Sequence, residues 1–273
     1  MRRAERIAAL AVGLAALAAG HRGAAAQHHH HHHAAGDDAA VAQPSVTAMA
    51  MLSLEVGTVE AFAGDRDYQS ASIMASARHR QAELMVHVPY YRLELGSTWE
   101  GGVGDAHIEG RWHALSAPGV LGGDLAGGVS FAVMPPLGDD DLGLAMGHWM
   151  LMAGTFASYS SGRFSASGNL GWGGALGGGG HAEHGGGVWP PVSPMNAQEI
   201  EFSIAPQLAL GYGIGVSAGL SGAAPIGDGK VIGLVRAGAT IALGRFEVGL
   251  GAGHGVAGHP GGLRVGTHVM AMF

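Results

Sequence analysis

Histidine is the residue type in this sequence that most directly suggests metal chemistry. The chain of 273 residues contains 17 histidines, and six of them form one uninterrupted run. Imidazole nitrogens bind Zn, Cu or Ni, and a flexible run can hold such an ion loosely without a folded site. Two interpretations stay open, a native metal-capturing tail and an inserted purification tag. The run consists of His28, His29, His30, His31, His32 and His33.

A second pair of histidines brackets a glutamate in a glycine-rich stretch. His181 and His184, with Glu183 between them, carry side chains that can ligate a cation. A glycine-rich loop gives its ligands no fixed geometry, and the zinc-protease pattern of two histidines on one helix face is absent from the sequence. We therefore expect 173–197 to be a solvated loop, and we expect the protein to have no resident cofactor.

The most coherent chemical set is a series of charged and histidine side chains that alternate with apolar residues. In 106–115, for example, His107, Glu109, Arg111 and His113 share one parity, and apolar residues occupy most of the other. Such alternation is typical of a strand with one polar and one apolar face. A charge on the lipid side of a membrane strand costs about 2–4 kcal/mol near the bilayer midplane, so the polar rows would face a lumen. The predicted lumen-lining residues are His87, His107, Glu109, Arg111, His113, Arg163, Glu201, Arg236, Arg245, Glu247, Arg264 and His268.

The elements that must position these residues are twelve strand-like segments separated by Gly, Pro, Asp and Ser clusters. Tight connections near 80–81, 160–162, 210–212 and 244–245 follow even-numbered segments, and a link around 117–119 is somewhat longer. The long connections follow odd-numbered segments: 96–105, 135–147, 173–197, 223–229 and 254–262. Short turns on one side and long loops on the other are typical of outer-membrane barrels. The predicted segments are 48–62, 67–79, 82–95, 106–115, 124–134, 148–159, 162–172, 198–209, 212–222, 230–242, 245–253 and 263–273.

Composition supports a membrane barrel and excludes several other classes. Hydrophobic residues make up 47% of the chain but are dispersed among 50 glycines. No apolar run after the first residues reaches the roughly 18 residues of a membrane helix. The net charge of -7 lacks the excess of positive charge typical of proteins that bind nucleic acid, and the lack of cysteine excludes disulfides. We predict an all-β fold, a 12-stranded antiparallel transmembrane β-barrel of the outer membrane with short periplasmic turns and long extracellular loops.

Both ends of the chain are expected to direct it to the bacterial outer membrane. A basic start, an apolar run over 7–19 and small residues up to Ala26 predict a secretory signal peptide, 1–26. A disordered His-rich periplasmic tail, 27–46, and the barrel, 47–273, would follow. The last segment alternates in polarity and ends on Phe273, a pattern that the barrel assembly machinery reads. It should pair with the first segment, and an even strand number would leave both termini in the periplasm.

One segment departs from the alternation. Within 82–95, Glu83 and His87 have one parity, whereas Arg92 and Glu94 have the other. A β-bulge at 89–90 would restore the parity, because Pro89 cannot donate to a ladder. We therefore predict a bulge at that point.

Three short motifs between 88 and 147 resemble a known family. The run Val88-Pro-Tyr90, then Gly102-Val-Gly-Asp105, then Pro136-Leu-Gly-Asp139 is similar in order and spacing to the outer-membrane transporter-like family named "MetA-pathway of phenol degradation". The resemblance implies a barrel that moves small, often aromatic, molecules across the outer membrane. Glycine and aspartate are also common in turns, and we expect both Gly-Asp motifs to form turns rather than a binding site.

Together these features predict a passive channel for small solutes, embedded in outer-membrane lipid. The cargo would be aromatic or hydrophobic compounds, or metal ions. Two alternatives stay open: a lipid hydrolase with a Ser/His pair on the outer rim of the barrel, and a structural barrel with a plugged lumen. Because no His-x-Ser arrangement lies on a predicted lipid-facing strand, we predict that the protein is not an enzyme.

Overall fold

The computed structural model describes residues 46–61, 64–95, 97–139, 144, 147–176, 197–229, 231–258 and 261–273. The predicted signal peptide, all but the last residue of the predicted tail, and the pair His181 and His184 lie outside the described residues. Among those that are described, no helix is long and apolar enough to cross a membrane.

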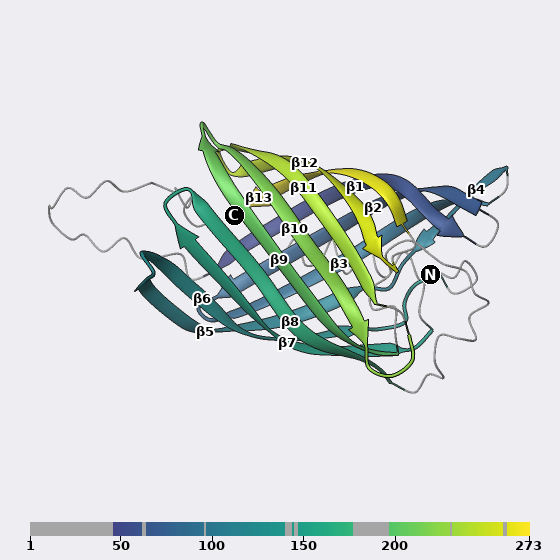
Figure 1. The fold of residues 1–273 in the computed structure, drawn as a ribbon, viewed down its shortest axis with the longest axis horizontal. Helices are drawn as coiled ribbons and strands as arrows, with labels where there is room; N and C mark the ends of the chain where they lie inside the picture. The colour runs from purple at the N-terminus through teal and green to yellow at the C-terminus, as the bar shows by residue number, and fades with distance from the viewer. Residues whose placement is uncertain are drawn as a thin grey trace, which may run out of the picture.

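The described residues form thirteen strands of a single antiparallel sheet that closes on itself (Figure 1). β4 and β5 pair one after the other with the two halves of β3, so together they occupy one position in the wall. β1 pairs with β13, as the sequence predicted, and this pairing closes the ring. The fold is therefore an antiparallel barrel with twelve strand positions, which confirms the predicted fold class. The strands are β1 (Thr47–Ala61), β2 (Gly64–His79), β3 (Ala82–Leu95), β4 (Thr98–Val103), β5 (His107–Val120), β6 (Gly123–Met134), β7 (Trp149–Ser161), β8 (Phe164–Leu176), β9 (Gln198–Gly211), β10 (Ile214–Pro225), β11 (Ile232–Leu243), β12 (Phe246–Ala257) and β13 (Gly261–Met272).

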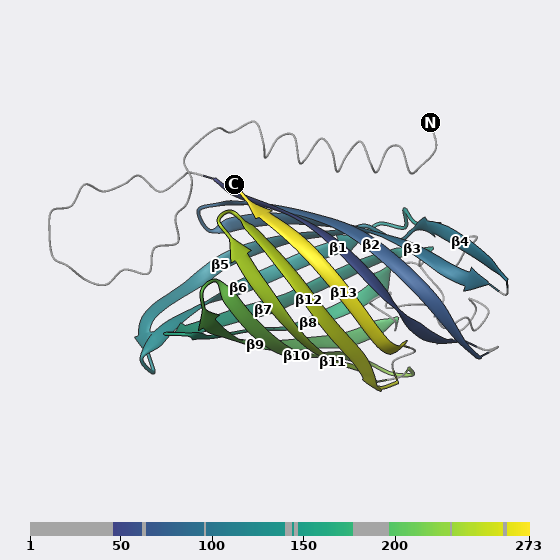
Figure 2. The same ribbon diagram turned by 90° about the horizontal axis from the view of Figure 1, so that it is seen from above.

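The two ends of the barrel differ in their connections. One end, called here the turn end, has only two-residue links between strands, at 80–81, 121–122, 162–163, 212–213 and 244–245. The opposite end, the loop end, has the connections 135–148, 177–197, 226–231 and 258–260, and the three-residue link 104–106 lies within the wall. Thr47 and Phe273 lie at the turn end, and Figure 2 shows the C terminus and β4 at opposite ends of the barrel. The predicted asymmetry is thus present, although the strands reach further toward the loop end than expected.

Backbone geometry explains two of the tight turns. The central residues Leu121 and Gly122 have φ angles of 51° and 78°, and Tyr212 and Gly213 have 54° and 77°. Positive φ at both central positions is the mark of the type I′ hairpin, whose twist matches that of the flanking strands. The turn after β5 is therefore at 121–122, and the link predicted around 117–119 belongs to the end of that strand.

Side chains on the strands alternate between an apolar outer face and a more polar inner face. On β1, Leu52, Leu54 and Val56 are about half exposed on the outside. Glu55 lies between them in sequence and points inward, where it bonds to Tyr68 of β2. The same alternation holds at β12, two strands from β1, and at β8, further round the wall, where Leu250 and Leu170 are exposed on the outer face.

The predicted loop 96–105 is wrong, because six of its residues form β4. Pro89 explains where β4 ends. The backbone N–H and C=O of a residue in an antiparallel strand point toward the same neighbour. Pro89 accepts a hydrogen bond from the Gly104 N–H (3.0 Å) but has no N–H of its own to return. Residues 104–106 leave the ladder at this point, and pairing with β3 resumes at His107.

The predicted bulge within β3 is also wrong. The pairing of β2 with β3 runs without a shift from Tyr68 opposite Leu93 to His79 opposite Ala82. The irregularity lies in the neighbouring chain, between β4 and β5. Arg92 therefore stays on the outer parity, with its guanidinium 5.4 Å from the ring centre of Trp99. β3 has 14 residues, more than the roughly 9–11 needed to cross a bilayer, so its loop end can extend into water.

Candidate functional site in the barrel lumen

Four ion pairs between described residues line the inner wall, and the first two lie close together. His113 Nε2 is 3.0 Å from Glu83 Oε2, and Arg111 Nε is 2.8 Å from Glu109 Oε1. Phe156 of β7 packs against both cations, 5.4 Å from the Arg111 guanidinium and 4.9 Å from the His113 ring. These contacts join the polar parity of β5 to inward side chains of β3 and β7.

The other two ion pairs lie on the opposite arc of the wall, where β12, β13 and β1 meet. His268 Nε2 is 3.6 Å from Glu247 Oε1. Arg264 lies 3.9 Å from Glu55 Oε1, and the Tyr68 hydroxyl donates to the same carboxylate at 2.5 Å. Arg264 is only 2% exposed, so this guanidinium is held inside the wall rather than in the open lumen.

Four more predicted lumen residues are on the inner face. His87 and His107 are direct cross-strand partners on β3 and β5. Arg236 projects inward from β11 and is exposed there. Glu201 also faces inward, and its carboxylate lies near Gly173 of β8, where an added Cβ would be 3.5 Å from Oε1.

Two predicted lumen residues lie elsewhere. Arg163 and Arg245 are the second residues of the 162–163 and 244–245 turns, and both are exposed at the turn end. The Arg245 guanidinium packs over Phe246 (5.2 Å) and Phe273 (5.9 Å), which belong to the outer face. The reason is local: Gly162 and Gly244 have positive φ angles of 56° and 64°, so each begins the turn one residue before its arginine.

The two Gly-Asp motifs bond to each other, which the sequence did not predict. Asp105 Oδ1 accepts a hydrogen bond from the Gly138 N–H at 3.0 Å, and Asp139 Oδ2 accepts one from the Val103 N–H at 2.8 Å. The Asp139 N–H donates in turn to the Val103 carbonyl at 2.9 Å. This set of four residues, called here the Gly-Asp latch, ties the connection after β6 to the break between β4 and β5.

The latch positions an apolar side chain in the interior. The Leu144 N–H donates to the Asp139 carbonyl at 3.1 Å. Leu144 itself is fully buried and packs with Tyr68, Tyr91 and Leu93, which face inward from β2 and β3. The connection after β6 therefore narrows the loop end of the lumen on one side. Local patterns could not reveal this contact, because it joins residues far apart in the sequence.

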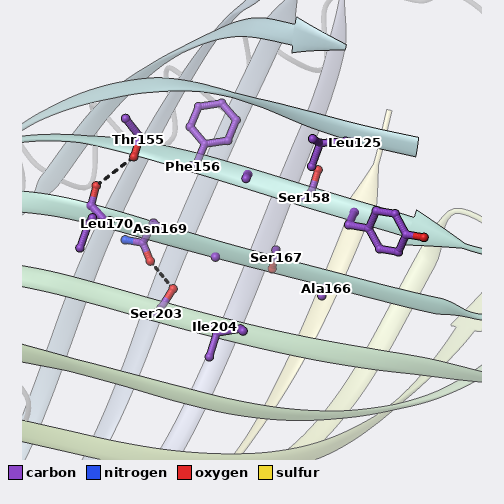
Figure 3. Close-up of a pocket in the computed structure, with 13 residues that line it drawn as sticks. Leu125, Thr155, Phe156, Ser158, Ala166, Ser167, Asn169, Leu170, Ser203 and Ile204 are labelled. Carbon is purple, nitrogen blue, oxygen red and sulfur yellow. Dashed lines mark hydrogen bonds between the residues drawn. The ribbon is translucent and has the colours of Figure 1, made fainter. Parts of the chain in front are cut away.

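On the side of β7, β8 and β9 the inner face carries small polar side chains. Ser158, Ser167 and Asn169 point inward yet are exposed to solvent. An open hollow of about 480 Å³ follows these strands and is lined by residues of both parities, Ser167 and Asn169 among the inward ones and Ala166 and Leu170 among the outward ones (Figure 3). Ser203 donates a hydrogen bond to the Asn169 side chain, and Thr155 donates to the Leu170 carbonyl at 3.4 Å. No histidine is among the residues of the described chain that line this hollow, so its serines have no imidazole base there.

The sequence also contains one Gly-x-Ser-x-Gly pattern, from Gly215 to Gly219. In hydrolases that pattern forms a sharp turn between a strand and a helix, which exposes the serine. Here all five residues lie inside β10 in regular pairing with β11. The pattern therefore does not form a nucleophile elbow. Within the described part of the chain, no group of three or more His, Asp or Glu side chains could hold a metal ion.

Comparisons with known proteins identify the fold. No model of a known protein family matches the sequence, and no curated protein is significantly similar to it. The resemblance to the phenol-degradation family therefore stays a prediction. Among solved structures, the COG4313 outer membrane channel from Pseudomonas putida F1 aligns with a TM-score of 0.59 and 13% identity, over 88% of this chain and 100% of that one.

Two further structures align less closely. OpdK of Pseudomonas aeruginosa, solved with vanillate, has a TM-score of 0.41 and 11% identity, over 83% of this chain and 98% of that one. Outer membrane phospholipase A from Escherichia coli has a TM-score of 0.43 and 11% identity, over 81% of this chain and 92% of that one. By its likeness to the Pseudomonas putida channel, this chain has the closed antiparallel fold of an outer-membrane β-barrel.

Proposed function

We propose that this protein is a channel of the bacterial outer membrane through which small solutes diffuse passively. The outer face supports insertion in a membrane. Leu250, Leu170 and Leu263 are 63%, 57% and 60% exposed on it, and so large an apolar surface is stable only against lipid or another apolar partner. Aromatic residues occur on this face near both ends, including Trp149 and Trp172 at the loop end and Phe246 at the turn end, as in the interfacial girdles of membrane barrels.

One observation supports a channel in particular. Ser158, Ser167, Asn169 and Arg236 point away from the outer face and are nevertheless exposed. Their exposure means that the interior beside them has space for water, which a channel requires. The ion pairs on the remaining wall place charges of both signs beside that space, and rings of charged side chains are a common basis for selectivity in pores.

The orientation follows from the connections. We propose that the turn end faces the periplasm and the loop end faces outward, which is the arrangement of bacterial barrels in general. The last strand, which ends on Phe273, would be the one that the assembly machinery reads; in the closed barrel Phe273 and Ala48 exchange two backbone hydrogen bonds, of 2.8 and 3.1 Å. For the cargo, the sequence resemblance favours aromatic or hydrophobic solutes, with metal ions as the second class.

Conductance across planar lipid bilayers tests the channel, with a matched pair of variants to locate the pathway. Ser167→Trp adds a large ring on the inner face and is expected to lower the single-channel conductance by roughly half or more, because it narrows the lumen. Ala166→Trp adds the same ring one residue away, on the outer face, and should leave the conductance unchanged. Folding of each variant is checked by its heat-dependent mobility on gels.

Two results would contradict the proposal. Folded wild-type protein without any conductance would indicate a plugged barrel. Equal conductance in the wild type and in both variants would mean that the current does not pass along β8. A lipid-release assay on the same samples addresses the hydrolase alternative, for which we expect no activity.

A further inference from the structure

The methionines of the barrel wall all lie on its inner face. Nine methionines lie within the thirteen strands, and each has the same parity as the inward residues of its strand, such as Glu55 on β1 or Phe156 on β7. Methionine is apolar and suits a lipid face as well as an interior, so placement by hydrophobicity alone would divide these residues between the two faces. The lumen is therefore rich in thioether sulfur.

One cross-strand row brings three of these methionines beside two histidines. Each member is the direct partner of the next in the pairing of neighbouring strands. Partners in register have their side chains on the same face of the sheet, with Cβ atoms about 4.5–5.5 Å apart. This Met-His row consists of Met270 on β13, Met51 on β1, Met74 on β2, His87 on β3 and His107 on β5.

Methionines flank the histidine pair on both sides. Met74 is the partner of His87 on β2. On the other side Ile108 of β5 pairs with Val133 of β6, so the register places Met134 opposite His107. Met134 is buried and packs against Met150 of β7. Two imidazoles and at least two thioethers thus lie on adjacent positions of one concave wall.

The histidine pair also has an unused nitrogen. The Nε2 atom of His107 is buried and has no hydrogen-bond partner among the described residues. A buried polar atom without a partner is uncommon in folded proteins, and a bound ion is one explanation for it. The side chains of Met74, His87 and His107 are each partly exposed, so an ion in the lumen can reach them.

The types of ligand select the ion. Thioether sulfur is a soft ligand that favours Cu(I), and imidazole also binds copper, whereas Mg²⁺ and Ca²⁺ require oxygen ligands. Glu109, two residues from His107 on the same face of β5, is engaged by Arg111 through two hydrogen bonds, of 2.8 and 3.2 Å. The described residues also contain no group of three His, Asp or Glu side chains that could hold a metal ion. Sulfur therefore decides the chemistry of the row.

From this arrangement we infer that Met74, His87 and His107 form a binding site for Cu(I) in the wall of the lumen. The role of the site in transport rests on the proposed channel function, for which it specifies a soft metal cation as the cargo. The binding itself does not rest on that function. It can be measured on folded protein in detergent without any membrane.

Two measurements on the purified full-length protein test the site. Competition with bicinchoninate, a chelator whose Cu(I) complex is coloured, gives the affinity under ascorbate and without air. X-ray absorption at the copper edge then identifies the bound atoms. Because the chain has no cysteine, sulfur on the copper can come only from methionine, and the run 28–33 can supply only nitrogen. Copper is added until the protein is saturated, and we expect both sulfur and nitrogen around it.

Matched variants locate the site. Met74→Leu removes the sulfur but keeps the volume of the side chain. It should weaken Cu(I) binding by about tenfold or more, because loss even of an outer partner of a metal site costs about 10–100-fold in affinity. His107→Gln should weaken it to a similar extent. Met272→Leu is the control, since Met272 has the same inner face but is opposite Met49 rather than a histidine, and its affinity should equal that of the wild type. Gel mobility verifies that each variant is folded.

Each outcome decides the inference. Bound copper without sulfur around it would overturn the site, and so would an unchanged affinity in Met74→Leu. Equal losses in Met74→Leu and Met272→Leu would also overturn it, because the sulfur would then act without the histidines. If the protein binds Cu(I) through the row but conducts no current, the channel function fails and the copper site stands. If it conducts but binds no Cu(I), the reverse holds.

Discussion

Replacing Gly57 with alanine is expected to destabilise the barrel where β1, β2 and β13 meet. A Cβ atom at this position would lie 2.8 Å from Tyr68 Cε1, 3.0 Å from Arg264 Cβ and 3.1 Å from the Leu263 carbonyl oxygen. Tyr68 is 1% and Arg264 2% exposed, so neither can move into open space. The added methyl group must therefore push apart two strands or displace the tyrosine ring.

The size of the effect follows from these contacts. Forcing an extra methyl group into a packed site costs about 1–3 kcal/mol. Displacement of Tyr68 would also weaken its hydrogen bond to Glu55, and hydrogen bonds to charged groups contribute about 1.5–3 kcal/mol. We expect the free energy of unfolding to fall by about 2 kcal/mol, since the ring can yield by a few tenths of an ångström and keep part of that bond.

Urea unfolding of the protein in lipid vesicles, followed by tryptophan fluorescence, measures this loss. With a dependence on urea of about 1–3 kcal/mol per M, the midpoint should decrease by roughly 1 M. Gly110→Ala is the matched control, because its nearest neighbour would be the Phe131 carbonyl oxygen at 3.9 Å. Its midpoint should stay unchanged or rise slightly. If both variants unfold at the same urea concentration, the close packing inferred around Gly57 is refuted.

Three further predictions concern the latch, the orientation and the tail. Asp105→Ala removes the acceptor of the Gly138 N–H. Loss of a partner for a buried polar group costs about 1–3 kcal/mol, so amide exchange at Gly138 should become at least tenfold faster. Unchanged exchange would rule out the latch. The chain has no cysteine, so single cysteines report orientation. In intact cells an impermeant maleimide should label Ile226→Cys but not Arg163→Cys, and the opposite pattern would reverse the barrel. Deleting 28–33 should lower tolerance to periplasmic Cu or Zn if the histidines capture metal, whereas unchanged tolerance would indicate a tag or inert spacer.

Strand alternation predicted much of the barrel because it is a local property. In β13 the parity of Arg264 and His268 alone indicated an inward position, and the structure places both side chains beside glutamates of neighbouring strands. The same parity placed His113 correctly on β5. A shift by one residue would turn every side chain to the other face, so these assignments needed no knowledge of distant contacts.

Features that depend on a single residue or on distant contacts were not predictable in this way. Arg163 and Arg245 left the strands because each follows the glycine that opens a turn, and the repeated Gly-Arg-Phe sequence at both turns was the overlooked signal. β4 has only six residues, two of them glycine, so its alternation is too short to recognise. The hydrogen bonds of the Gly-Asp latch join positions more than thirty residues apart, and no local pattern contains them.

The break between β4 and β5 has an evolutionary consequence. Pro89 lacks the N–H that would reach the neighbouring strand, Gly104 closely approaches its ring, and the freed segment binds Gly138 and Asp139. In a related barrel with another residue at position 89, the new backbone N–H would point toward 104–106, which has no acceptor in place for it. An unbonded buried N–H costs about 1–3 kcal/mol. A related barrel without one of the aspartates would instead leave part of the latch unbonded. Mutations at these positions are therefore expected to be tolerated only in combination, so that related barrels should either have the whole set or lack it.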